Sequence, residues 1–195
     1  MARVGAAARD ERAAAIERPS MLTVGTVVWL TSELMFFGAL FAAAFTLRAE
    51  AGGRWPEGDA DVDVLLAGAL TLLLVTSSVT QHAATVAAER RNLAGTRRWL
   101  AVTVLLGAVF VGGQLFEWST LDFSISSHAF GSAFYTLTGF HLLHVFAGVV
   151  ALAVVLARAL RQPARLRPGL DVVTAYWHFV DVVWLAVFGT LYLLP

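Results

Sequence analysis

The sequence predicts an all-α fold, a polytopic membrane bundle of five transmembrane helices, and three observations support this. Hydrophobic residues make up 58% of the 195 residues and charged residues only 14%, a composition far from that of an ordinary soluble domain. Five apolar runs are long enough to cross a hydrocarbon core as helices. All five prolines lie outside these runs, as unbroken helices require.

The apolar runs divide the chain into a short cytoplasmic arm, residues 1–20, and one membrane domain, residues 21–195. The spans are expected at about 22–47, 64–84, 99–116, 131–156 and 172–194. The first span is about 25 residues long and has no small-residue cleavage pattern, so we interpret it as a retained span rather than a signal peptide.

The distribution of arginine predicts the orientation of the bundle. All 14 basic residues are arginines: the arm, the second loop and the fourth loop carry four each, and the first loop carries two. The third loop and the C-terminus carry none. The positive-inside rule therefore places the N-terminus in the cytoplasm and the C-terminus outside. Anionic lipid headgroups are the expected contacts of these arginines.

Composition also excludes several classes of function. The chain has no cysteine, which excludes a disulfide, an iron–sulfur cluster and a thiolate metal site. The sequence shows no nucleophile–base arrangement, phosphate-binding loop or nucleic-acid patch. We therefore predict no catalytic residue and no nucleic-acid partner.

Ionisable side chains lie within the spans and are candidates for a buried polar network: Glu33, His141, His144, His178 and Asp181. Such groups rarely face lipid, because charge at membrane depth is costly. We expect a satisfied network that links the fourth and fifth spans. Glu33 is expected to be neutral and hydrogen-bonded. It either forms a structural hydrogen bond between helices or serves as a proton-exchanging site. His178 and Asp181 share a helix face. They are expected to form either an ion pair that locks the helix in place or a proton relay.

The spacing of His141 and His144 is weak support for a metal or haem site, since imidazole is a common ligand. Bulky neighbours flank these histidines, so we predict no metal and no cofactor in this chain. Gly139 and Gly148 are expected to allow close packing. Trp177 and Trp184 lie too deep for an interfacial belt and are expected to pack against another helix or a lipid chain.

Polar residues at the span ends have a simpler interpretation. Gln114, Glu117 and Trp118 are expected to form an interfacial end of the third span. His82 is expected to snorkel at the inner end of the second span.

Three motifs resemble subunit III of the haem–copper cytochrome c oxidases, most closely the five-helix actinobacterial form. They are Ser32-Glu33-Leu34-Met35-Phe36-Phe37, the segment from Gly139-Phe140-His141 through His144-Val145 with Gly148, and Tyr176-Trp177-His178-Phe179-Val180-Asp181-Val182-Val183-Trp184. The similarity covers residues 19–194. The chain departs from the family pattern in two ways. Mitochondrial members have seven helices, and this chain lacks the counterparts of the first two. Leu142 stands between His141 and His144, where the family usually has a small residue.

The resemblance implies a subunit without a redox centre, in a bacterial cell membrane. Its implied partners are oxidase subunit I directly, subunit II and the small subunits, membrane lipids, and a cytochrome bc complex in a supercomplex. Haems and copper are expected in the partner subunits, and structural phospholipids on this one. The implied complex oxidises cytochrome c, reduces oxygen and pumps protons. The alternatives are a quinol oxidase subunit or a nitric oxide reductase-associated homologue, an independent proton channel or transporter, and a haem-binding electron carrier.

Overall fold

The computed structural model describes residues 21–52, 55–56, 62–162 and 166–194. The predicted arm at residues 1–20 lies outside them. The described residues form five long helices and no strand: α2 (Met21–Glu50), α3 (Val64–Glu89), α4 (Leu93–Thr120), α5 (Ala129–Arg161) and α6 (Arg167–Phe188), which continues as a π-helical turn, η2 (Gly189–Leu193). Each is long and apolar enough to span a membrane, which confirms the predicted all-α class and the five spans.

The helix ends follow local chemistry rather than hydropathy. Asp63 accepts a hydrogen bond from the Leu66 backbone N–H at 2.9 Å and starts α3, and Asn92 does the same for Gly95 at the start of α4. Side-chain caps of this kind satisfy the free N–H groups of a first turn. Pro168 lies in the first turn of α6, where a missing N–H costs nothing. The helices therefore run several residues beyond the predicted spans.

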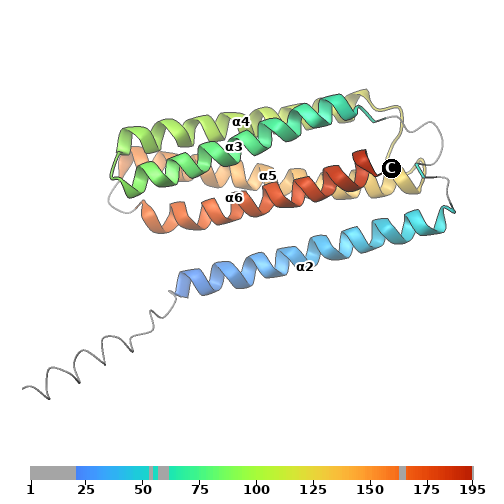
Figure 1. Cartoon of the computed structure of the whole chain (residues 1–195), viewed down its shortest axis with the longest axis horizontal. Helices are drawn as coiled ribbons and strands as arrows, with labels where there is room; N and C mark the ends of the chain where they lie inside the picture. The colour runs from blue at the N-terminus through green and yellow to red at the C-terminus, as the bar shows by residue number, and fades with distance from the viewer. Residues whose placement is uncertain (1–20, 53–54, 57–61, 163–165, 195) are drawn as a thin grey trace, which may run out of the picture.

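Four helices form a closed bundle, and α2 lies against one side of it. Around the bundle α3 contacts α4, α4 contacts α5, α5 contacts α6, and α6 contacts α3, whereas α2 contacts α5 and α6 (Figure 1). The exposed surface of α2 is extensive, because only Phe37 and Ala44 are buried along its length. The fold thus has one compact core and one peripheral helix.

One end of the molecule is rich in arginine. Here α2 and α6 begin, α3 is joined to α4, and α5 ends (Figure 1). We call it the arginine-rich end; its arginines are Arg90, Arg91, Arg97, Arg98, Arg158, Arg161 and Arg167. Arg97 donates from Nε and Nη2 to the Ala159 carbonyl at 3.0 and 2.8 Å, which ties α4 to the last turn of α5.

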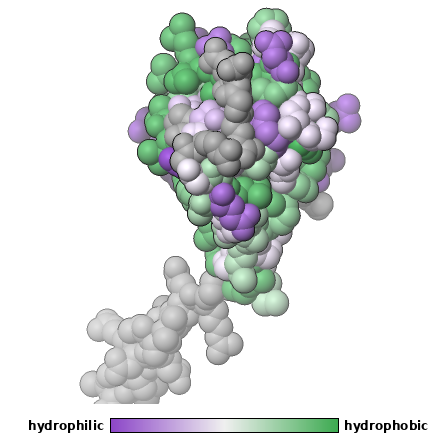
Figure 2. Space-filling model, turned by 90° about the vertical axis from the view of Figure 1, so that its right-hand side faces the viewer, coloured by the Kyte–Doolittle hydropathy of each residue, from purple (hydrophilic) through white to green (hydrophobic). Residues whose placement is uncertain are grey.

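The opposite end carries the loops that follow α2 and α4. Viewed onto this end, hydrophilic residues gather on the face and hydrophobic residues cover the flanks (Figure 2). The arrangement fits a bundle with an apolar belt and two polar ends. The orientation of the termini stays a prediction.

Trp177 lies in the core of the bundle. Its side chain is fully buried, and its Nε1 donates to Ser77 Oγ on α3 at 3.0 Å. A Cβ atom on Gly107 of α4 would lie 2.7 Å from this ring, and one on Gly148 of α5 would lie 2.9 Å from it. The indole is thus held between two helices that can approach only because both contact positions are glycine.

Candidate functional site

Glu33 and His144 join the peripheral helix α2 to the bundle. Glu33 Oε2 lies 3.0 Å from His144 Nε2 on α5, and Trp29 Nε1 donates to Glu33 Oε1 at 3.0 Å. Both carboxyl oxygens therefore have a partner. The two side chains are mostly buried, with 23% of Glu33 and 15% of His144 exposed.

The other ring nitrogen of His144 determines how this pair shares protons. His144 Nδ1 lies 2.6 Å from the Phe140 carbonyl, and a carbonyl only accepts, so Nδ1 carries a hydrogen. The bond between Nε2 and Glu33 then holds one proton, either on the carboxyl of Glu33 or on the imidazole. In both arrangements the pair as a whole is neutral, which suits a site at membrane depth.

Aromatic rings surround the Glu33–His144 pair. Trp29 stacks on Tyr176 of α6 with ring centroids 4.9 Å apart and planes 9° apart. The Tyr176 hydroxyl donates to the His144 carbonyl at 3.0 Å. The Phe37 ring lies edge-on to His144, with centroids 5.0 Å apart. Together these contacts connect α2, α5 and α6 at one level of the molecule.

A second polar cluster lies between α3 and α6. Ser78 Oγ is 2.7 Å from His178 Nδ1, and the same hydroxyl donates to Asp181 Oδ2. His178 and Asp181 lie on one face of α6, as their spacing predicts, and this face is turned toward α3. Among the described residues no hydrogen bond joins His178 directly to Asp181. Each of them bonds the Ser78 hydroxyl instead.

His141 differs from the other polar residues of the predicted network. It is fully buried, and neither ring nitrogen has a hydrogen-bond partner among the described residues. Its ring lies against Trp184 at 4.9 Å and against Phe110 at 5.9 Å. Trp184 itself donates from Nε1 to Thr71 Oγ1 on α3 at 2.8 Å.

We predicted that the five ionisable residues form one polar network between the fourth and fifth spans. The structure places them in three separate environments instead. Glu33 and His144 form one cluster, His178 and Asp181 form another with Ser78, and His141 packs among aromatic rings. The reason is geometric: a helix turns by about 100° per residue, so His141 and His144, three apart on α5, differ in direction by about 60°. Because α5 and α6 each have three neighbouring helices, side chains this far apart in direction contact different neighbours.

Sequence reasoning missed Ser78 and Trp29 as partners of these groups. Ser78 lies in a polar run from Thr76 to His82, and the sequence does not indicate which of its hydroxyls faces α6. Trp29 lies four residues before Glu33, the helical spacing that brings two side chains together. Position on a helix could have found Trp29, whereas Ser78 required the packing of α3 against α6.

Gln114 and Glu117 form a third polar cluster. The prediction that they belong to an interfacial end of the third span is wrong. Both side chains are fully buried. Gln114 Nε2 donates to Glu117 Oε2 at 2.6 Å, and the Tyr192 hydroxyl donates to the same oxygen at 3.1 Å. The π-helical turn after α6 places Tyr192 over this carboxyl, a contact that hydropathy could not reveal. His82 is exposed on the surface of α3, and its snorkelling stays a prediction.

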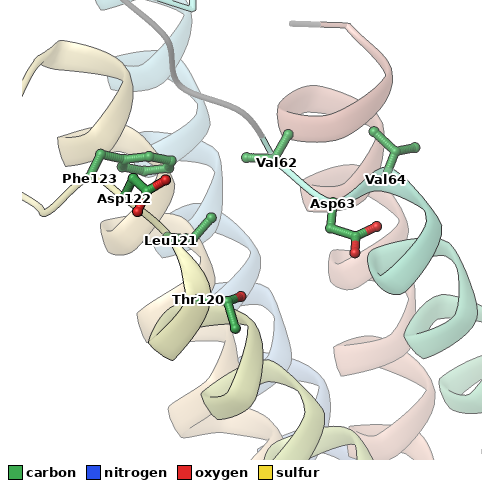
Figure 3. Close-up of a pocket in the computed structure, with 7 residues that line it drawn as sticks. All are labelled: Val62, Asp63, Val64, Thr120, Leu121, Asp122 and Phe123. Atoms are coloured by element: carbon green, nitrogen blue, oxygen red, sulfur yellow. The ribbon is translucent and has the colours of Figure 1, made fainter.

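Two surface pockets lie at opposite ends of the bundle. The larger, about 530 Å³, lies at the end opposite the arginines, between the start of α3 and the loop after α4 (Figure 3). Asp63 at its rim is the N-terminal cap of α3. A second pocket of about 370 Å³ lies between the first turns of α2 and α6 and includes Arg167 and Asp171. Among the described residues there is no group of three His, Cys, Asp or Glu side chains placed to hold a metal ion.

Comparison with known proteins identifies the family. A sequence model of the family described as "Cytochrome c oxidase subunit III" matches residues 9–194. The chain belongs to this family. This confirms the resemblance that the three motifs predicted.

The relatives include proteins from actinobacteria and cyanobacteria. The chain is 45% identical over 188 residues to "Probable cytochrome c oxidase subunit 3" of Nocardia farcinica, covering 93% of this chain and 92% of the relative. It is 46% identical over 193 residues to "Cytochrome c oxidase subunit 3" of Corynebacterium diphtheriae, covering 95% and 94%. The protein of the same name from Thermostichus vulcanus is 38% identical over 182 residues. As a family member with five long apolar helices, the chain is a multi-pass membrane protein of a haem–copper oxidase.

Proposed function

We propose that this chain is the non-redox subunit III of a proton-pumping cytochrome c oxidase in a bacterial cell membrane. The observation that carries the proposal is the family match over residues 9–194, together with relatives that are matched along nine-tenths of their length. The complex transfers electrons from cytochrome c to oxygen in partner subunits, which hold the haems and copper. This chain supports that chemistry from outside the redox centres.

The peripheral position of α2 supports a role in assembly. Large apolar side chains are exposed along it: Met21, Leu22, Val24, Val27, Val28, Trp29, Leu34, Met35, Phe36 and Phe45. A helix with so little of its surface buried needs lipid or another helix as its neighbour. In the proposed function, subunit I and structural phospholipids cover the surfaces that this bundle leaves open, and subunit II and the small subunits complete the complex.

The Glu33–His144 pair has a structural role in this proposal. Both oxygens of Glu33 and both nitrogens of His144 are engaged in hydrogen bonds. A carboxyl whose bonding capacity is met in this way positions a helix. Through this pair α2 keeps a fixed place against α5 and α6, and the surface offered to subunit I keeps its shape.

The arginine-rich end supports the predicted lipid contacts. Arg90, Arg98, Arg158, Arg161 and Arg167 are exposed there. Exposed arginines at the end of a membrane bundle attract anionic headgroups. We propose that phospholipids bind at this end, and that the same end faces the cytoplasm.

Purification in mild detergent tests the proposed function. The tagged chain should bring down a haem–copper oxidase core, seen as partner subunits and as the haem spectrum of the complex. Copurification of a cytochrome bc complex would extend the assembly to a supercomplex. A chain that purifies alone and conducts protons in liposomes would contradict the proposal, as would a Soret band in the isolated chain.

A further inference from the structure

Ser78 occupies an unusual position between two ionisable residues. Its single hydroxyl contacts both His178 Nδ1, at 2.7 Å, and Asp181 Oδ2. The two side chains come from the same face of α6, and the serine comes from the middle of α3. A hydroxyl can accept one hydrogen bond while it donates another, so the three groups form a continuous hydrogen-bonded chain.

The two ends of this chain differ in their access to the outside of the bundle. Asp181 is 6% exposed, and its Oδ1 has no partner among the described residues. His178 is only partly buried. Asp181 is the fifteenth residue of α6, so about 21 Å of helix at 1.5 Å per residue separates it from the arginine-rich end. The chain therefore links a carboxyl deep in the bundle to an imidazole at its edge.

Further polar side chains continue the line toward the arginine-rich end. Gln81 Nε2 donates to Thr174 Oγ1 at 2.8 Å, and Thr85 Oγ1 lies 3.2 Å from the same oxygen. His82, one turn beyond Ser78 on α3, is exposed and close enough to His178 to interact with it electrostatically. Among the described residues, His82 is a further titratable side chain that interacts with the cluster. Polar groups thus follow the contact between α3 and α6 from its end to its middle.

Two arrangements of the same protons satisfy this chain. In the first, the imidazolium Nδ1–H donates to Ser78 Oγ, and the Ser78 O–H donates to the Asp181 carboxylate. In the second, protonated Asp181 donates to Ser78 Oγ, and the Ser78 O–H donates to the neutral imidazole. Going from the second to the first breaks the Asp181 and Ser78 O–H bonds and forms a new Ser78 O–H bond and the His178 N–H bond. The net charge is zero throughout.

We propose that His178, Ser78 and Asp181 form a proton-transfer unit, in which the Ser78 hydroxyl carries protons between the buried carboxyl and the partly exposed imidazole. The unit allows Asp181 to pass its proton to His178, and from there toward the arginine-rich end along the polar contact of α3 and α6, instead of through the packed interior. It is a property of this chain alone and holds whether or not the proposed subunit role is correct.

Infrared spectroscopy of the purified full chain in phospholipid nanodiscs tests this directly. At neutral pH the C=O stretch of protonated Asp181 should be identified by its disappearance in Asp181→Asn. After transfer to D₂O the band should shift as the carboxyl exchanges its proton. Ser78→Ala should retain the band but slow its shift by about a hundredfold, the contribution of a positioned proton carrier. Ser78→Thr keeps a hydroxyl and should restore fast exchange.

Matched variants separate proton transfer from packing. Thr76→Ala removes an exposed hydroxyl on the same helix, which among the described residues bonds only the Leu72 carbonyl, and it should leave the exchange rate unchanged. His178→Phe keeps a ring without nitrogens and should slow exchange as Ser78→Ala does, which provides a second route if one variant fails to fold. Exchange at the wild-type rate in either variant would overturn the proposal. So would a wild-type spectrum without a protonated band sensitive to Asp181→Asn.

Discussion

At the scale of single residues, Glu33 is defined by what its two oxygens contact. Oε1 accepts from Trp29 in its own helix, and Oε2 bonds His144 in another. An amide can reproduce both bonds, because its oxygen accepts from the indole and its N–H₂ donates to Nε2 of a neutral imidazole. A methyl-terminated side chain can reproduce neither.

Glu33→Gln should therefore assemble and retain most oxygen consumption and proton pumping. Glu33→Leu leaves the indole N–H and the imidazole Nε2 without partners, at a cost on the order of 1–3 kcal/mol for a buried polar group. It should weaken the attachment of α2 and lower the content of this subunit in the purified oxidase. Turnover, pumping and subunit content are measured in both variants.

Ser32→Ala is the matched control for these variants. Ser32 neighbours Glu33 and is exposed, and within the described part of the chain its hydroxyl bonds only the Trp29 carbonyl. Its removal should therefore change none of the three measurements. A Gln variant that assembles fully but loses most of its pumping would contradict the structural role and make Glu33 a proton-handling residue.

The sequence could predict which residues are polar at membrane depth, but only part of how they pair. Hydropathy marks Glu33 and Asp181 because charge is rare in a span, and the helical repeat places Asp181 beside His178. The partner across a helix contact depends on the rotation of each helix in the bundle. This is why Ser78 was missed and why His141, predicted to be satisfied, lies among rings of Trp184 and Phe110.

At the scale of elements, the close approach of α4, α5 and α6 depends on glycine at the surface of Trp177. A methyl group on Gly148 would lie 2.9 Å from two atoms of this rigid, fully buried ring. Neither the ring nor the backbone can yield easily in a packed core. Gly139, on the same helix, is different: a methyl group there would be 3.7 Å from Trp118, an ordinary contact.

Gly148→Ala should therefore destabilise the bundle, with overpacking costing about 1–3 kcal/mol against a gain in helix propensity of about 1 kcal/mol. Gly139→Ala gains the same propensity without the clash and should be neutral or stabilising. Thermal unfolding in detergent, followed by tryptophan fluorescence, should give a lower midpoint for the first variant only. Equal midpoints would show that α5 and α6 can separate without cost.

The same scale shows where hydropathy misjudged helix length. The third span was expected to begin near Trp99, but α4 begins at Leu93 because Asn92 caps it. The last span was expected to begin near 172, but Pro168 allows α6 to begin at Arg167. Hydropathy reports which part of a helix lies in hydrocarbon, whereas capping and backbone hydrogen bonding decide where the helix ends.

At the scale of the whole molecule, the five-helix bundle was predictable because apolar length is a strong signal in a membrane protein. The division into a four-helix bundle and a peripheral α2 was not, since all five runs are similarly apolar. The structure accounts for it through contacts: among the described residues, α2 packs mainly against α5 and α6. Its open surfaces are those a larger complex would cover.

The orientation of the bundle in the membrane can be tested with single introduced cysteines, because the chain has no cysteine of its own that would be labelled. Ser126 lies in the exposed loop between α4 and α5, and Arg90 lies at the exposed, arginine-rich turn between α3 and α4. These two loops are at opposite ends of the bundle (Figure 1). Because arginine-rich loops stay on the cytoplasmic side, a membrane-impermeant maleimide should label Ser126→Cys in intact cells. It should label Arg90→Cys only after the membrane is opened.

Reporter fusions at the two termini provide the second arm of this test. With five spans and twelve arginines on one side against two on the other, a reporter before Met1 should be cytoplasmic and one after Pro195 external. An even number of spans would place both reporters on one side, and an inverted bundle would exchange the labelling of Ser126→Cys and Arg90→Cys. Either result would contradict the arginine-based orientation, and the first would also contradict the five-span fold.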